Sequence, residues 1–218
     1  MRKSLNKIAV LALVGLFLAV SCNKDKPVQS ETKEVATADG KAYTVDTQSS
    51  SIEWKGYKVF KSENTSHFGT MNFLNSEVSI KDNKLVAGKF TADVKSLTNV
   101  DLKDDKESSD KLNGHLKSPD FLDVEKLPTA TYEITKVTDA TTGDYNSIIE
   151  GNLTIKEITK PAKFNANVSV NDGVVTIATG PTDINREDFG VKFKAPLENG
   201  VIKNEITLQI LVKASEKK

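Results

Sequence analysis

Apolar and polar side chains alternate along most of the chain from about residue 41 onward. In "AKFNANVSV" (162–170) every second residue is apolar, and the residues between them are polar. The segments "NEITLQILV" (204–212) and "VAGKFTADV" (86–94) repeat this period of two, which is typical of strands with one buried face. The pattern therefore predicts β structure.

Five further segments show the same alternation, which brings the expected number of strands to about eight. They are residues 51–59, 67–73, 129–137, 148–155 and 174–180. Turn residues separate neighbours, as in "NDG" (171–173), because Asn, Asp and Gly tolerate positive φ. Strands in hairpin order predict an antiparallel sheet, either closed as an up-and-down barrel or packed as a sandwich.

Residues 103–122 depart from this pattern. "KDDKESSDKLNGHL" has almost no β-branched residues and carries its acidic residues early, and "SPDFL" follows it. We expect one or two short helices here, with Ser118 as the N-cap and Pro119 as the first residue of the second helix. The fold class predicted is therefore all-β with a short helical insertion.

The N-terminus has the pattern of an export signal. Three basic side chains in the first seven residues precede an apolar run, 8–20, that is too short to cross a bilayer. Cys22, the single cysteine, follows, and "LAVSC" resembles the lipobox of bacterial lipoproteins, in which the cysteine is acylated and becomes the first residue. Ala19 stands where that pattern prefers Leu. An ordinary signal peptide that ends near a cysteine is the alternative.

These patterns divide the chain into three parts. Residues 1–21 are predicted as a lipoprotein signal peptide, 22–40 as a lipidated flexible tether, and 41–214 as one β-barrel domain. The tether is polar and lacks aromatic residues, so it cannot bury enough apolar surface to fold. Loss of residues 1–21 leaves 30 − 3 = 27 basic against 30 acidic residues, a net charge of −3 that argues against nucleic-acid binding.

Four segments, in this order along the chain, resemble the YceI family of periplasmic, lipocalin-like proteins that bind polyisoprenoids or other lipids. They are "YTVDTQSSSIEW" (43–54), "HLKSPDFLDVEKLPTATYEI" (115–134), "GNLTIKEITKPAKF" (151–164) and "INREDFGVKF" (184–193). The resemblance implies an antiparallel eight-stranded lipocalin-like barrel. Two departures are residues 55–71, where the likeness is looser, and Leu122, which stands where many members have a second Phe.

The family resemblance implies a lipid inside the barrel, and the interior of eight strands is just wide enough for side chains or one small ligand. The predicted lipid-binding side chains are aromatic and fall mostly on inward faces: Trp54, Phe73, Phe90, Phe121, Tyr132 and Phe164. Small residues on such faces, Gly88, Ala92, Ala162 and Ala166, would leave volume for a chain-like ligand. The alternative is an ordinary dry core.

Arg186, in "NREDFG", is the predicted lipid-binding residue that carries a charge. One possibility is that it pairs with Glu187 or Asp188 and locks its loop. The other is that it meets a phosphate or carboxylate head group at the barrel mouth, which suits the forked donors of arginine.

Catalytic and metal chemistry have few candidates. His115 and His67 are far apart in the sequence and the cysteine is assigned to lipid, whereas a zinc site needs three or four ligands. Asp120, Asp123 and Glu125 do not form an obvious acid–base pair, because nothing indicates that both partners are buried. We therefore predict no cofactor, no metal and no catalysis.

The sequence thus predicts a membrane-anchored periplasmic protein that holds a polyisoprenoid or another long-chain amphiphile. Asn23 after the cysteine, in place of aspartate, favours the outer membrane. One alternative is a structural or stress-related envelope lipoprotein whose barrel is filled by its own side chains. Two others are an enzyme that acts on a lipid through His115 or His67, and a partner that receives lipid from an electron-transfer or synthesis enzyme.

Overall fold

The computed structural model describes residues 32–61, 63–194 and 200–216. These residues form eleven strands, one α-helix, α1 (Lys106–Lys117), and one 3-10 helix, η1 (Arg186–Phe189). The strands are β1 (Lys41–Val45), β2 (Ser51–Phe60), β3 (Glu63–Phe73), β4 (Glu77–Lys81), β5 (Lys84–Asn99), β6 (Thr129–Asp139), β7 (Ser147–Ile155), β8 (Ile158–Asn171), β9 (Val174–Thr179), β10 (Thr182–Asn185) and β11 (Gly200–Glu216).

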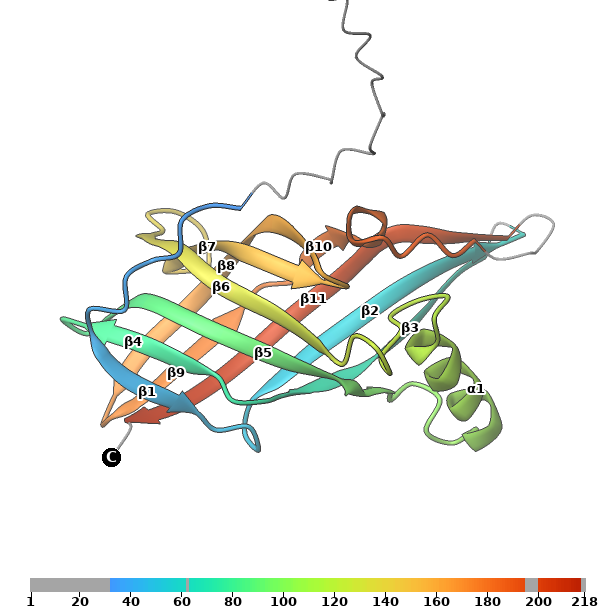
Figure 1. Cartoon of the computed structure of the whole chain (residues 1–218), viewed down its shortest axis with the longest axis horizontal. Coiled ribbons are helices and arrows are strands. Elements are labelled where there is room, and N and C mark those ends of the chain that lie inside the picture. Colours follow the sequence, from blue (N-terminus) through green and yellow to red (C-terminus); the bar gives the residue numbers. More distant parts are fainter. Residues whose placement is uncertain (1–31, 62, 195–199, 217–218) are drawn as a thin grey trace, which may run out of the picture.

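Eight of the strands close into a barrel. Their order around the ring is β5, β3, β2, β11, β9, β8, β7 and β6, and β6 pairs again with β5. Neighbouring strands in the ring run antiparallel (Figure 1). The predicted eight-stranded antiparallel barrel is confirmed, and the sandwich alternative is wrong.

The three remaining strands extend the walls of this ring. β1 pairs with β11 beyond the point where β2 ends, and β4 pairs with β5 beyond the point where β3 ends. β10 pairs with β11 in the same way, beyond β9. The chain leaves the sheet between β1 and β2, between β3 and β4, and between β9 and β10. Three of the eight walls are therefore made of two strands each, which gives eleven strands where the sequence predicts eight.

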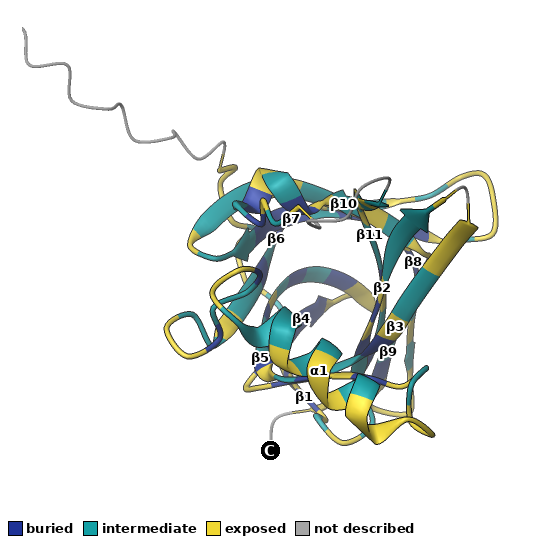
Figure 2. Ribbon diagram, turned by 90° about the vertical axis from the view of Figure 1, so that its right-hand side faces the viewer, coloured by how far each residue is buried: buried dark blue, intermediate teal, exposed yellow. Residues whose placement is uncertain are grey.

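The helical insertion is a single helix between β5 and β6. Asp105 caps its N-terminus, where the carboxylate accepts a hydrogen bond from Ser108 N at 3.0 Å. The second helix allowed by the sequence does not form, because Ser118 instead ends α1, with its N–H and hydroxyl both donating to the His115 carbonyl. Figure 2, viewed along the barrel, shows α1 lying across one end of it.

The two ends of the barrel differ. At the end opposite α1, β1 and β4 bring buried side chains together with others from β5, β9 and β11 (Figure 1). These are Tyr43, Val45, Val78, Ile80, Leu85, Val175 and Ala214. This end of the barrel is therefore a packed core.

The segment before β1 lies along the outside of the barrel. Buried Asn152 holds it by two hydrogen bonds, because its side-chain amide donates to the Lys33 carbonyl and accepts from the Lys33 N–H, at 2.8 and 3.0 Å. Ala36 N–H donates to the Ile134 carbonyl, and Asp39 pairs with Lys81. The part of the predicted tether that is described, from residue 32, thus makes specific contacts.

The signal peptide, Cys22 and the tether up to residue 31 lie outside the described residues, and their boundaries stay predictions. Within the described ranges, no helix is long and apolar enough to span a bilayer.

Candidate functional site: an apolar cavity inside the barrel

The half of the barrel nearer α1 encloses a cavity of about 570 Å³. Ligand pockets typically measure about 300–1,000 Å³, and an apolar cavity of about 150 Å³ is enough to hold one benzene. Residues from all eight strands of the ring, from α1 and from η1 line it. The cavity therefore has the volume to hold one chain-like molecule.

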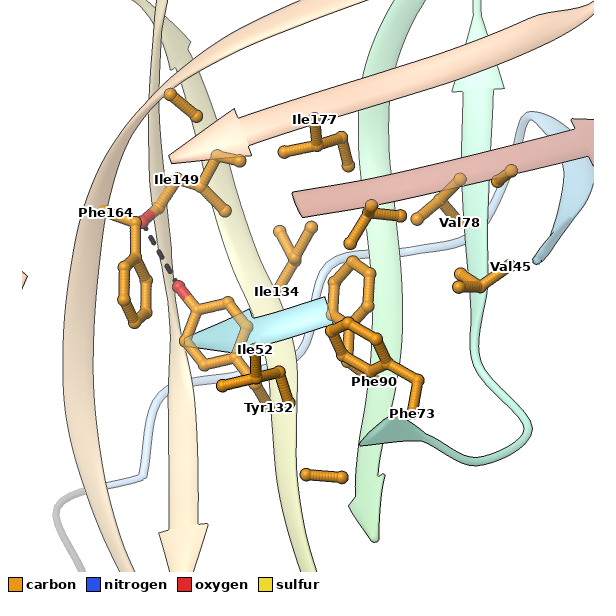
Figure 3. Close-up of a cluster of buried hydrophobic side chains, with 14 of the residues drawn as sticks. Val45, Ile52, Phe73, Val78, Phe90, Tyr132, Ile134, Ile149, Phe164 and Ile177 are labelled. Atoms are coloured by element: carbon orange, nitrogen blue, oxygen red, sulfur yellow. Dashed lines mark hydrogen bonds between the residues drawn. The ribbon is translucent and has the colours of Figure 1, made fainter. Parts of the chain in front are cut away.

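Four aromatic rings form the floor of this cavity, where it meets the packed end (Figure 3). The ring centroids of Phe73 and Phe90 are 6.1 Å apart, those of Phe90 and Tyr132 are 6.4 Å apart, and those of Tyr132 and Phe164 are 5.3 Å apart. All four side chains are buried. They come from β3, β5, β6 and β8, so the floor crosses the barrel from wall to wall.

Tyr132 supplies the polar group of the floor. Its hydroxyl donates to the carbonyl oxygens of Ile149 and Ala162, at 3.2 and 3.3 Å. Burial raises the pKa of the Tyr132 phenol above its ordinary value, and the negative charge of Glu150 adds to this. The phenol therefore stays neutral at physiological pH, and the floor presents no charge to a ligand.

The walls above the floor are mostly apolar. Ile206, Leu208, Ile210 and Val212 of β11 all line the cavity, as the alternation of that segment predicts. Trp54 of β2 is 7% exposed, and its indole N–H finds no hydrogen-bond partner among the described residues. A buried donor without a partner costs about 1–3 kcal/mol. An oxygen atom of a bound molecule or of water would remove that cost.

The mouth lies at the α1 end, where the side chains of His67 and His115 are 39% and 40% exposed. The His115 ring packs edge-on against Phe121 and Phe193, with centroid distances of 5.0 and 4.6 Å. Leu116 of α1 also lines the cavity. α1 and the turn that follows it therefore border this end of the cavity.

Arg186 is 5% exposed and lines the cavity wall. Its Nε and Nη1 donate to the carbonyls of Lys203 and Val191, at 3.1 and 2.7 Å, and its Nη2 donates to Asn204 Oδ1 at 3.2 Å. The expectation that Arg186 pairs with Glu187 or Asp188 is wrong, because backbone carbonyls hold the guanidinium in place. Burial lowers the pKa of Arg186, and nearby Glu187 offsets this in part.

The two histidines have different partners. His67 Nδ1 lies 2.7 Å from Asp101 Oδ2, and Asp101 Oδ1 accepts a hydrogen bond from the Phe68 N–H. His115 Nε2 lies 3.8 Å from the nearest Asp120 carboxylate oxygen. Over the described ranges, no three His, Cys, Asp or Glu side chains gather in a way that could hold a metal ion.

The structure brings together every predicted lipid-binding side chain on the wall of one cavity. These are Trp54, Phe73, Phe90, Phe121, Tyr132, Phe164 and Arg186, whose role in binding stays a prediction. Of the four small residues expected to leave volume, only Ala92 lines the cavity. The space beside Gly88 is taken by Phe90 and Ile134.

Sequence reasoning missed a second set of lining residues. Leu112 and Leu116 are four positions apart on α1, with His115 between them, and this spacing marks one face of a helix. Phe189 and Phe193 come from η1 and the segment after it, and Lys58 comes from β2. Both the α1 residues and Lys58 were detectable locally, because the spacing on α1 marks one helix face and Lys58 continues the period of two that Ile52, Trp54 and Gly56 begin.

Comparison with known proteins agrees with this architecture. The family model for the YceI-like domain matches residues 43–214. A UPF0312 protein of Pseudomonas putida is 30% identical over 152 residues, which are 65% of this chain and 75% of that protein. A UPF0312 protein of Shewanella baltica is 33% identical over 109 residues, 47% of this chain and 53% of that protein, so the chain spans about half the length of this relative.

Two solved structures share the fold. The crystal structure of BcnA from Burkholderia cenocepacia matches with a TM-score of 0.61 and 22% identity, over 78% of this chain and 99% of that one. A polyisoprenoid binding domain from Saccharophagus degradans matches with a TM-score of 0.54 and 14% identity, over 81% of this chain and 99% of that one. The chain belongs to the family of proteins with a YceI-like domain.

Proposed function

We propose that this protein is a non-catalytic lipid carrier, and that its barrel holds the apolar chain of one polyisoprenoid or similar long-chain amphiphile. The observation that carries the proposal is the cavity of about 570 Å³ with its aromatic floor and apolar walls. Each methylene moved from water into such a site contributes about 0.8 kcal/mol. The description of the Saccharophagus degradans domain as polyisoprenoid binding supports this ligand class.

Two rival functions, a structural lipoprotein and a lipid-acting enzyme, account less well for the apolar cavity. A purely structural lipoprotein has no need for a hollow barrel, whereas a lipid carrier does. For an enzyme, His67 and His115 are the available bases, and His115 packs between two phenylalanine rings without a close acidic partner.

The test of lipid carriage uses native mass spectrometry and fluorescence titration. Trp54 is the single tryptophan and lines the cavity, so its fluorescence should report occupancy directly. We expect a lipid adduct on protein purified from membranes in mild detergent, and saturable binding of geranylgeraniol by protein stripped of lipid. A bare polypeptide mass together with no response to geranylgeraniol would refute the proposal.

A matched pair of variants localises the binding. Ala92→Trp fills the cavity beside the floor and should abolish the adduct, whereas Val201→Trp places the same side chain on an exposed position of β11. Since both variants add a second tryptophan, native mass spectrometry is the readout for them. Equal loss of the adduct in both variants would show that the lipid binds elsewhere.

We further propose that acylated Cys22 anchors the carrier in the periplasm, at the outer membrane. The basic start, the apolar run and the "LAVSC" segment support this. Metabolic labelling with an alkyne fatty acid should mark the wild type but not a Cys22→Ala variant, and the wild type should sediment with outer-membrane vesicles. Equal labelling of both proteins, or sedimentation with the inner membrane, would contradict the anchor or its location.

A further inference from the structure

The charged and chargeable side chains that line the cavity are basic, apart from the tyrosines. Four of its lining residues carry or can acquire a positive charge: Lys58, His67, His115 and Arg186. None of the described residues that line the cavity is acidic. A pocket that binds only a neutral apolar chain does not need basic side chains. The excess of basic lining residues therefore suggests a contact with the head group of the ligand.

Strand pairing places two of these side chains close together near the mouth. His67 of β3 is paired with Gly56 of β2, and Lys58 follows Gly56 by two residues on the same face. The side chains of Lys58 and His67 are therefore diagonal neighbours on the inner surface of one strand pair. A glycine at position 56 leaves the wall between them open, because a Cβ there would make only one contact, with Ile206.

Arg186 is held on the other side of β2. The pairing of β11 with β2 shifts register between Ile202, opposite Lys58, and Ile206, opposite Gly56. The residues in this irregular stretch, Lys203 and Asn204, are those that hold the Arg186 guanidinium. Lys58 of β2 and His67 of β3 thus lie on neighbouring strands, and Arg186 of η1 is held against the irregular stretch of β11 that lies on the other side of β2.

These three groups have donors to spare. A guanidinium has five N–H groups, and three hydrogen bonds involve that of Arg186, none of them to a carboxylate. A buried charge without a counter-ion is costly. Among the described residues, no ion pair includes Lys58 or Arg186. His67 Nε2 makes no hydrogen bond to a described residue, since Asp101 binds Nδ1.

We infer that the cavity selects amphiphiles with an anionic head group, a phosphate or a carboxylate, which lies between Lys58, His67 and Arg186. The apolar chain then runs inward to the aromatic floor. This inference rests on the proposed lipid carriage and adds to it the class and orientation of the ligand. Charge-assisted hydrogen bonds to phosphate or carboxylate are about twice as strong as neutral ones.

The test compares ligands that differ only in the head group. Geranylgeranyl phosphate, geranylgeranoic acid and geranylgeraniol share one chain, and their dissociation constants are measured by Trp54 fluorescence. We expect the phosphate to bind roughly tenfold or more tightly than the alcohol, with the acid between them. Since the mouth is open to solvent, the preference should decline as ionic strength rises.

The matched variants are Lys58→Gln and Lys55→Gln. Both lysines are on β2, but Lys55 is exposed on the outer face, beside Tyr57. Lys58→Gln should reduce the ratio of alcohol to phosphate dissociation constants severalfold, and Lys55→Gln should leave that ratio at the wild-type value. His67→Gln should act in the same direction as Lys58→Gln. These positions are preferred to buried Arg186, whose replacement could unfold the loop it holds.

The outcomes separate the two proposals. Equal affinity of the wild type for the alcohol and the phosphate would overturn the inference while lipid carriage stands. The same loss of preference in Lys55→Gln and Lys58→Gln would also overturn it, because general surface charge would then explain the preference. Failure of all three ligands to bind the wild type would refute lipid carriage itself.

Discussion

At the scale of single residues, Gly151 and Tyr132 show how tightly the floor is fitted. A Cβ on Gly151 would lie 2.4 Å from Tyr132 Cζ and 2.6 Å from the Glu133 carbonyl oxygen. We expect Gly151→Ala to displace the Tyr132 ring and to lower the free energy of unfolding by about 1–3 kcal/mol. Urea unfolding of the purified variant measures this change.

A second glycine provides the control. A Cβ on Gly114, in α1, would have no heavy atom within 4 Å. Gly114→Ala should raise the free energy of unfolding by roughly 0.5–1 kcal/mol, because alanine loses less conformational entropy than glycine in a helix. The two substitutions should therefore change the free energy of unfolding in opposite directions. A stabilising Gly151→Ala would show that the residues around Tyr132 have room for an added methyl group.

The buried phenol of Tyr132 makes stability depend on alkaline pH. Burial raises its pKa in the folded protein, while in the unfolded chain the value is about 10. The folded state thus favours the neutral phenol, so this contribution to stability is complete below pH about 10 and is lost as the pH rises further. Tyr132→Phe should show a shallower decline in unfolding free energy between about pH 9 and 11 than the wild type. Parallel declines would rule out a buried phenol.

At the scale of elements, Asn99 connects the cover to the barrel. This last residue of β5 is 5% exposed, and its side-chain amide donates to the Ser109 carbonyl at 3.1 Å and to Asn113 Oδ1 at 2.9 Å. α1 buries none of its own side chains fully, so these bonds attach it to the barrel together with the apolar packing of Leu116.

We therefore expect Asn99→Ala to loosen α1 without opening the barrel. Hydrogen exchange of the α1 amides should accelerate at least tenfold, and a bound isoprenoid should dissociate faster because the cover over the mouth opens more often. Lys106→Ala, which removes an exposed ion pair with Asp110, is the control and should change neither rate. Unchanged exchange in Asn99→Ala would show that other contacts hold the helix.

The elements also show where alternation fails as a guide. On β11, Ile206 to Val212 line the cavity at a strict spacing of two. On β5, Ala92 and Leu97 both line it although they are five residues apart, because the pairing with β3 shifts register there. The Ser96 hydroxyl bonds to the Asp93 carbonyl inside this irregular stretch. A reversal of face of this kind depends on the partner strand, so the sequence of β5 alone does not predict it.

At the scale of the whole molecule, one part of the cavity can be predicted from the local sequence, and another part depends on contacts between residues far apart in the chain. The floor follows from local alternation, because Phe73, Phe90, Tyr132 and Phe164 each lie on the inner face of their own strand. The position of Arg186 follows from bonds to residues that lie up to 18 positions away in the chain. Its loop carried a recognisable motif, but the sequence could not show which oxygens would hold the guanidinium.

A barrel packed at one end and hollow at the other sets a limit on ligand length. Because the floor blocks the barrel, a chain that enters at the mouth stops at Phe73 and Phe90. For saturated fatty alcohols of increasing length, each added methylene should tighten binding by about 0.8 kcal/mol, or roughly fourfold, while it still enters the cavity. Beyond the length that fills the cavity, affinity should level off, and Trp54 fluorescence titration locates that point.

Ala92 provides the means to move this limit. It is paired with Phe73 beside the floor, so Ala92→Leu should shorten the longest chain that is fully accommodated while leaving the gain per methylene unchanged for shorter chains. Leu211→Ala, on the outer face of β11 where the side chain is 36% exposed, should leave the limit in place. If affinity rises with chain length without a limit, or if Ala92→Leu does not shift it, the chain does not end at the aromatic floor, and a different path through the barrel would be required.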